Sequence, residues 1–152
     1  EHNGKIPSKY TCDGENINPP LKINDVPIKA KSLVLLMDDP DIPELAKKNF
    51  NVEVWDHLVV FNIPASVREI REGELPQGVM GRNTRGNNTY GGPCPPDREH
   101  RYFFKLYALD MMLNLKEGVS KKEVEEAMEG RIVAKTELMG RYERVEKQKK
   151  FK

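Results

Sequence analysis

The chain has 152 residues, and its 25 Lys and Arg nearly balance its 24 Asp and Glu, for a formal net charge of +1 at pH 7. This length suits a single domain over residues 1–152, and so little net charge argues against a nucleic-acid-binding protein, which needs a positive surface. No apolar run is long enough to span a membrane, and the first residues lack the apolar stretch of a signal peptide, so we expect no transmembrane segment and a cytoplasmic location.

The first third of the chain combines turn signals with one apolar run. Residues 5–31 contain Asp-Gly, Asn-Pro-Pro and Pro27, which predict short irregular strands and turns. Residues 32–37 form a continuous apolar run, which is typical of a strand buried on both faces. Residues 44–54 are polar, and we expect a loop or a single turn there.

Two further strands flank a long polar segment. Residues 55–63 are aromatic and β-branched and stop at Pro64, and residues 101–110 carry four aromatic side chains. Between them, residues 65–92 are rich in glycine and polar side chains. A connection of this length in a small domain tends to be functional rather than a plain link.

The last third predicts one helix and one strand. Ser120 and Glu123 form a capping box, in which each side chain accepts a hydrogen bond from the other residue's amide, and this predicts a helix over residues 121–129. Gly130 suits the left-handed position that follows a helix. Residues 131–142 have strand-like composition, and the basic residues after them are expected to form a solvated end. Together, the predicted strands and the one helix indicate a mainly β, sheet-on-sheet domain with a helix on its side.

Chemistry-bearing side chains gather where three predicted strands begin or end. Asp39 and Asp41 follow the first strand, His57 opens the next, and His100 and Tyr102 open the third. If these strands are neighbours, the five side chains reach one rim of the sheet. An aspartate can hold an imidazole in its charged form, and imidazoles, a tyrosine hydroxyl and loop amides together suit a phosphate or carboxylate.

Each of these residues also has a purely structural interpretation. The aspartates can cap a turn through their side chains, and His57 can be a half-buried histidine bonded to a backbone carbonyl. Tyr102 can be an ordinary core residue with a satisfied hydroxyl. The two cysteines, Cys12 and Cys94, are more often both free in a cytosolic chain, with a single disulfide as the second interpretation.

Four segments, taken together, resemble the phosphatidylethanolamine-binding protein (PEBP) family in its bacterial and archaeal Raf kinase inhibitor-like branch. They are TCDGENINPPL, DDPDIP, WDHLVVFNIP and GRNTRGNNTYGGPCPPDREHRYFFKLYALD, at Thr11–Leu21, Asp38–Pro43, Trp55–Pro64 and Gly81–Asp110. They occur in the family's order and roughly at its spacing. The resemblance implies a PEBP-like antiparallel β-sandwich, in which a smaller sheet flanks the central sheet, with one or two peripheral helices.

The resemblance also implies a ligand site and a function. It assigns a small anion pocket to Asp39, Asp41, His57, His100 and Tyr102, with Pro96 on its lining. The ligand is expected to be a phosphate, a phospholipid head group or a carboxylate, and no cofactor or metal is expected. The protein would be non-catalytic, with a protein partner and pairing into a homodimer as further expectations. The vertebrate proteins carry a C-terminal helix near the pocket mouth, whereas this sequence ends shortly after Tyr142, so we expect a small anion rather than a lipid head group.

Three other functions compete with this one. A hydrolase would use Cys94, or the Asp and His side chains, at the same rim, although Cys94 stands between two prolines and no nucleophile motif such as G-x-S-x-G appears. A metal site would draw on Asp39, His57, Cys94 and His100, but these ligands are dispersed along the chain. A protease-inhibitor-type interaction is a third alternative, resting on surfaces that the sequence does not identify.

Overall fold

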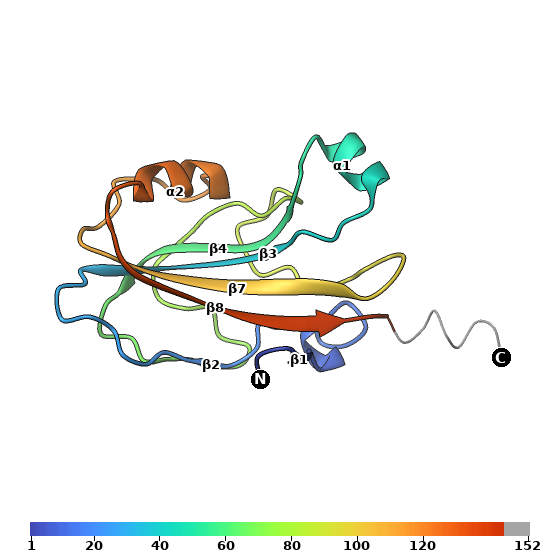
Figure 1. Ribbon diagram of the computed structural model, residues 1–152, viewed down its shortest axis with the longest axis horizontal. Helices are drawn as coiled ribbons and strands as arrows, with labels where there is room; N and C mark the ends of the chain where they lie inside the picture. Colours follow the sequence, from blue (N-terminus) through green and yellow to red (C-terminus); the bar gives the residue numbers. More distant parts are fainter. Residues whose placement is uncertain (145–152) are drawn as a thin grey trace.

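A six-stranded sheet forms the centre of the molecule in this computed structural model, which describes residues 1–144 (Figure 1). In spatial order its strands are β1 (Gly4–Lys5), β8 (Ile132–Tyr142), β7 (His100–Leu109), β3 (Ser32–Asp39), β4 (Trp55–Pro64) and β6 (Val79–Met80). The four long strands pair antiparallel, and only the short β1 pairs in parallel, with β8. The basic C-terminal residues from 145 onward lie outside the described part of the chain.

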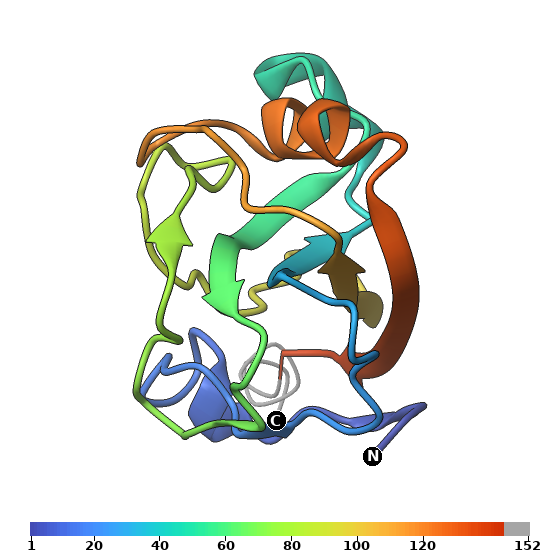
Figure 2. The same cartoon turned by 90° about the vertical axis from the view of Figure 1, so that its left-hand side faces the viewer.

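A second, two-stranded sheet lies against one face of the first. It pairs β2 (Leu21–Lys22) with β5 (Glu69–Ile70), and the short helix η1 (Ser8–Tyr10) lies in the same N-terminal part of the chain. Figure 2 shows the layers end-on, with the N-terminal segments below the central sheet and the helices above it. The mainly β architecture, with a smaller sheet flanking a central one, is therefore confirmed, although the central sheet is mixed rather than purely antiparallel.

The central strands are buried on both faces, which explains their apolar sequences. All eight residues of β3 are buried, and alternate side chains enter two separate cores. One core, which includes Leu33, Leu35 and Met37, fills the space toward the small sheet. The other, which includes Val34 and Leu36, packs under helix α2 (Lys121–Met128).

The two α-helices differ in how well the sequence predicted them. Helix α2 begins at the predicted capping box, where the Ser120 hydroxyl accepts from the Glu123 amide at 3.2 Å, and Gly130 after it has φ of +74°. Residues 44–54, expected to be a loop or a single turn, instead contain helix α1 (Glu44–Phe50). It follows Pro43, ends at Asn51 in the left-handed conformation, and buries no residue. Without a buried apolar stripe, it left no helical periodicity to find.

The two cysteines are joined in a disulfide, which corrects the expectation that both are free. Cys12 and Cys94 are 82 positions apart in sequence, and their Cα atoms lie 5.4 Å apart. The bridge ties the N-terminal loop to the proline-rich segment before β7. In the described part of the chain no helix has the length and apolar character needed to cross a membrane.

Candidate functional site

Three neighbouring strands of the central sheet bring the predicted site residues to one end. Strands β7, β3 and β4 are adjacent and antiparallel, so the end of β3 lies beside the starts of the other two. Asp39 ends β3, His57 lies near the start of β4, and His100 is the first residue of β7. The sheet order thus places these side chains together.

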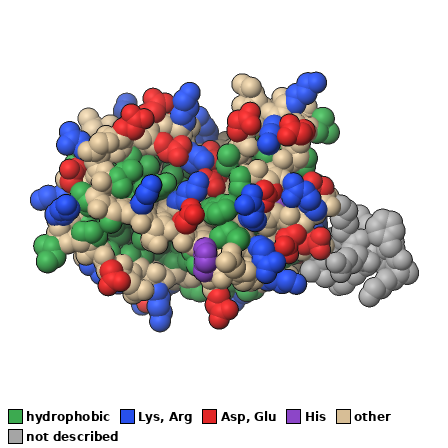
Figure 3. Space-filling model, viewed as in Figure 1, with side chains coloured by type: hydrophobic (Ala, Val, Ile, Leu, Met, Phe, Trp, Pro, Cys, Tyr) green, Lys and Arg blue, Asp and Glu red, His purple; other side chains and the backbone are tan. Residues whose placement is uncertain are grey.

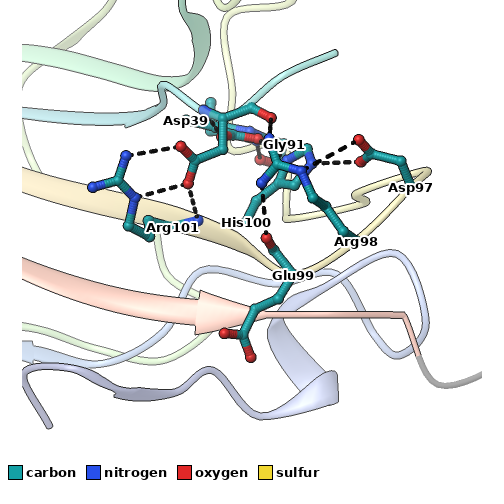
Figure 4. A network of polar contacts seen from close by, with 9 residues as sticks. Asp39, Gly91, Asp97, Arg98, Glu99, His100 and Arg101 are labelled. Atoms are coloured by element: carbon teal, nitrogen blue, oxygen red, sulfur yellow. Dashed lines mark hydrogen bonds and ion pairs between the residues drawn. The ribbon is translucent and has the colours of Figure 1, made fainter.

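His100 lies between two carboxylates and is only 1% exposed. Its Nδ1 is 2.6 Å from Asp39 Oδ2, and its Nε2 is 2.7 Å from Asp97 Oδ1 (Figure 4). Burial by itself would lower the pKa of His100, but the hydrogen bonds and negative charges of Asp39 and Asp97 outweigh it and raise that pKa. Because carboxylates accept hydrogen bonds, both ring nitrogens donate, and the ring is held as an imidazolium.

His57 has the opposite electrostatic character. Its Nδ1 donates to the backbone carbonyl of Gly91 at 2.6 Å, which fixes the proton on that nitrogen. Burial lowers the pKa of His57, so the ring is neutral near pH 7. Its Nε2 then carries a lone pair, and no described residue makes a hydrogen bond to it.

Tyr102 lies between the two imidazoles and is fully buried. Its ring centroid is 5.3 Å from that of His57, in an edge-to-face contact, and 6.3 Å from that of His100. The Tyr102 hydroxyl makes no hydrogen bond to any described residue. Burial, followed by the charge of Asp39, raises the pKa of this phenol, so the hydroxyl keeps its proton.

Asp41 has a different neighbour from the other site residues. Its carboxylate accepts from the Arg101 side chain at 2.9 and 2.8 Å and from the Arg101 amide at 2.9 Å. These contacts lower the pKa of Asp41 to about 2, chiefly through the hydrogen bonds from the guanidinium. The Asp41 amide also donates to Asp39 Oδ1 at 2.7 Å, so this residue helps to orient the carboxylate that holds His100.

The proline-rich segment before β7 forms a covalently anchored rim. Pro93 and Pro95 are buried, whereas Pro96, the proline predicted to line the pocket, is exposed. The Cys12 amide donates to the Pro93 carbonyl at 3.1 Å, beside the Cys12–Cys94 disulfide. Because proline fixes φ, this anchored segment limits where Asp97 and His100 can lie.

Sequence reasoning missed three groups of this site. Asp97 was the easiest of the three to predict, because it precedes His100 by three residues in the same short segment. The Gly91 carbonyl gives no signal in a sequence, since every residue carries one. Arg101 follows His100 directly, but its pairing with Asp41 across 60 residues depends on which strands are neighbours.

The competing site chemistries find little support in this geometry. The sulfur of Cys94 is bonded to Cys12, so it is not a thiolate nucleophile in this state. Among residues 1–144, no group of three or more His, Cys, Asp and Glu side chains is arranged to hold a metal ion. The site instead offers the positively charged ring of His100, the lone pair on His57 Nε2 and the buried hydroxyl of Tyr102.

Comparison with known proteins identifies a family with the same mainly β architecture. Residues 1–143 match the family described as Phosphatidylethanolamine-binding protein. A UPF0098 protein from Methanothermobacter thermautotrophicus is 51% identical over 147 residues, covering 93% of this chain and 92% of that protein. Another from Chlamydia trachomatis is 48% identical over 139 residues, covering 91% of each chain.

Two solved structures are similar over nearly the whole length. A putative PEBP homolog from Chlamydia trachomatis has a TM-score of 0.90 at 46% identity, covering 95% of this chain and 92% of that one. E. coli YbcL, described as a member of the mammalian PEBP family, has a TM-score of 0.82 at 29% identity, covering 94% and 93%. With its own fold and these bacterial and archaeal relatives, the chain belongs to the phosphatidylethanolamine-binding protein family.

Proposed function

We propose that the protein is a non-catalytic binding protein for a small anion, held between His57, His100 and Tyr102. The ligand class is a phosphate, free or as a phospholipid head group, or a carboxylate. The family's name describes binding rather than catalysis, which supports the non-catalytic assignment. A regulatory effect on a protein partner would follow from ligand binding at this end of the sheet.

The observation that carries the proposal is the unsatisfied Tyr102 hydroxyl beside an imidazolium. A buried hydroxyl without a partner costs free energy, and such groups in native structures call for an explanation. A ligand oxygen is a suitable acceptor for this hydroxyl. The lone pair of His57 Nε2 can take up a proton, after which this nitrogen also donates to a ligand oxygen.

Asp97 enters this proposal as the group that a ligand displaces. Its carboxylate accepts from His100 Nε2 at 2.7 Å, and its side chain is 39% exposed, so water can hydrate the carboxylate once a ligand has displaced it. A ligand anion would take over the same ring nitrogen. Asp39, which is buried on the other side of the ring, would keep the imidazolium oriented in both states.

Binding should couple to protons through His57. Burial keeps this ring neutral in the free protein, and a negative ligand at its Nε2 would raise its pKa. Affinity should therefore fall as pH rises through the pKa of His57 in the complex. Calorimetric titrations in buffers of different ionisation enthalpy should detect proton uptake at pH 7, and an affinity that is flat from pH 5 to 8 would rule out this coupling.

The direct test is calorimetric titration of the full chain with inorganic phosphate, phosphoethanolamine and acetate. We expect saturable binding of at least one of them, weakened about tenfold or more in His100→Asn, since a charge-assisted hydrogen bond is lost. His2→Asn is the matched control, because His2 is exposed and its ring accepts a hydrogen bond from the Met139 amide, away from the candidate site. Preference for phosphoethanolamine over phosphate would indicate a head-group ligand.

Absence of saturable binding of all three anions by the wild-type protein would contradict the proposal, as would equal affinities in wild type and His100→Asn. Circular dichroism of each variant shows whether it is folded. If His100→Asn does not fold, Tyr102→Phe supplies the test, because it removes only the hydroxyl.

The remaining expectations about location and assembly also stay proposals. A cytoplasmic location is compatible with a disulfide chiefly in organisms whose cytosolic proteins keep disulfides, as in some hyperthermophiles. Pairing of two copies is supported by the long strand edge that β8 presents to solvent.

A further inference from the structure

A hydrogen-bonded turn holds Arg85 next to the candidate site. The Asp56 amide donates to Thr84 Oγ1 at 2.7 Å, and the Thr84 amide donates to the Asp56 carbonyl at 3.0 Å. The Gly86 amide donates to the Asn83 carbonyl at 2.9 Å, and Gly86 has φ of +90°, a conformation that favours glycine. Because Asp56 directly precedes the site histidine of β4, these contacts fix the backbone of Arg85 close to that histidine.

The Arg85 guanidinium lies over the ring of Trp55. Its Cζ is 5.9 Å from the ring centroid, which is within the range of a cation–π contact. Trp55 is directly opposite Asp39 in the pairing of β4 with β3, and directly opposite residues project to the same face of a sheet. Asp39 holds His100 on that face. The guanidinium is therefore on the side of the sheet that carries the candidate site.

No carboxylate of this rim balances the charge of Arg85. The other two arginines here have acidic partners. Arg101 Nη2 is 2.8 Å from Asp41 Oδ1, and Arg98 Nε is 3.8 Å from Asp97 Oδ2. Within residues 1–144, Arg85 forms no ion pair, and its guanidinium contacts the aromatic ring instead. A ligand at this end of the sheet would therefore meet an uncompensated positive charge.

This charge acts on the site, and it acts locally. Burial is the main reason for the lowered pKa of His57, and the positive charge of Arg85 also lowers it. Over the face of the molecule in Figure 3, acidic and basic side chains are intermixed, and the whole chain carries a net charge of only +1. A broad field of one sign is thus absent from that face, so individual groups beside the site decide which ligand charges are favoured.

We propose that Arg85 makes the site selective for phosphate esters whose alcohol group carries no positive charge. The inference rests on the anion site proposed above, where the phosphate binds His57, His100 and Tyr102. The alcohol group of the ester would then lie beside the guanidinium. An ammonium there is repelled, and the face of Trp55 that could otherwise hold it is covered by Arg85.

Two phosphate monoesters of equal length test this selectivity. Phosphoethanolamine carries an ammonium where 2-hydroxyethyl phosphate carries a hydroxyl. In calorimetric titrations of the full chain at low salt, we expect 2-hydroxyethyl phosphate to bind roughly tenfold more tightly, because only phosphoethanolamine is repelled. In Arg85→Gln this ratio of affinities should fall below about threefold, and in Arg85→Glu it should reverse.

Arg82→Gln is the matched control. Arg82 is an exposed arginine of the same segment, and its guanidinium donates to the Gly118 carbonyl at 3.1 Å. This variant loses the same charge and should keep the wild-type ratio. Arg85→Lys should keep most of the ratio as well, since charge carries the selectivity, whereas a role in packing alone would be lost with the planar guanidinium. Circular dichroism shows whether each variant is folded.

Vesicles distinguish a lipid head group from a free phosphate ester. Cosedimentation with phosphatidylcholine vesicles that contain phosphatidylglycerol, lost in Arg85→Gln and kept in Arg82→Gln, would assign the ester to a lipid. Binding of the soluble ester without vesicle binding would assign it to a free phosphate ester, with the same charge rule. Preference for vesicles with phosphatidylethanolamine over those with phosphatidylglycerol would overturn the inference.

The titrations separate this inference from the anion site on which it rests. Equal affinities of the wild type for the two soluble esters would overturn the role of Arg85 and leave the anion site in place. The same holds for a ratio that Arg85→Gln does not change. If the wild-type protein binds neither ester, the anion site is wrong and the selectivity falls with it.

Discussion

At the residue scale, Tyr102 combines a stability cost with a role at the candidate site. Its hydroxyl is buried without a partner among the described residues, while its ring packs between His57 and His100. A structural tyrosine would be expected to have its hydroxyl satisfied. The opposite finding is what one expects of a group reserved for a ligand.

Replacing Tyr102 by Phe should therefore stabilise the free protein and weaken the complex. Removal of an unsatisfied buried hydroxyl should increase the free energy of unfolding by about 1 kcal/mol. Phosphate affinity should fall, because the ligand loses a donor. Urea denaturation and calorimetry of the same samples measure the two effects, and a destabilised Tyr102→Phe would show that the hydroxyl has a structural partner.

The Asp97 carboxylate gives a second prediction at this scale, in the opposite direction. Asp97→Asn removes a negative charge from the position where the ligand anion is proposed to bind. We expect phosphate to bind more tightly, by about threefold to tenfold, since a like charge no longer competes for His100 Nε2. Glu99→Gln, on the same segment, is the matched control, and a weaker complex in Asp97→Asn would mean that Asp97 supports the site rather than competes for it.

The Asp41–Arg101 pair predicts a dependence of stability on acid pH. Because the folded pKa of Asp41 is about 2, below its usual 3.8, its contribution is fully present above pH 4 and is lost as pH falls toward 2. Arg101→Met should flatten this decline. Arg101 is half exposed, so the effect will be screened by salt. Urea denaturation between pH 2 and 5 at low salt measures it, and identical pH profiles would contradict it.

At the scale of elements, the two α-helices show which local sequence signals are sufficient to predict a helix. Helix α2 has a capping box of two residues three positions apart and buries Val124 and Met128. Both features lie within one or two turns of sequence, so they can be predicted without knowing the fold. Helix α1 has neither, and the edge-to-face packing of Phe50 on Trp55, with ring centroids 4.8 Å apart, joins it to the next strand.

The cap of α2 can be tested by a single substitution. Ser120→Ala should lower the free energy of unfolding by about 1 kcal/mol, because the Glu123 amide loses its acceptor at the helix start. Ser66→Ala, at an exposed turn position, is the control. Thermal or urea unfolding should separate the two variants, and equal stabilities would show that the capping box contributes little here.

At the scale of the whole molecule, the disulfide links the N-terminal loop to the rim of the candidate site. Its two cysteines are 82 positions apart, so the chain-entropy estimate of its stabilisation is about 4.5 kcal/mol. The double variant Cys12→Ser with Cys94→Ser should show a correspondingly lower free energy of unfolding. Wild-type protein unfolded in the presence of a reductant is the matched comparison, and a loss below 1 kcal/mol would indicate that the rim is held mainly by packing.

The sequence alone determined the four long strands, helix α2 and the residue types at the strand ends. Apolar runs and capping pairs act between near neighbours in the chain, so they can be recognised in a linear sequence. The motifs also indicated the family, with its mainly β fold and its small flanking sheet. The role of Asp39, Asp41, His57, Pro96, His100 and Tyr102 in binding an anion remains a prediction.

Only the tertiary structure decided which of these groups meet. Because β7, β3 and β4 are neighbours, Asp39 bonds to His100, 61 residues away in sequence. Asp41 pairs with Arg101 rather than with either imidazole. The tertiary structure also joins Cys12 to Cys94. Pairs this far apart in sequence depend on strand order and register, which follow from burial of the whole sheet rather than from any local pattern.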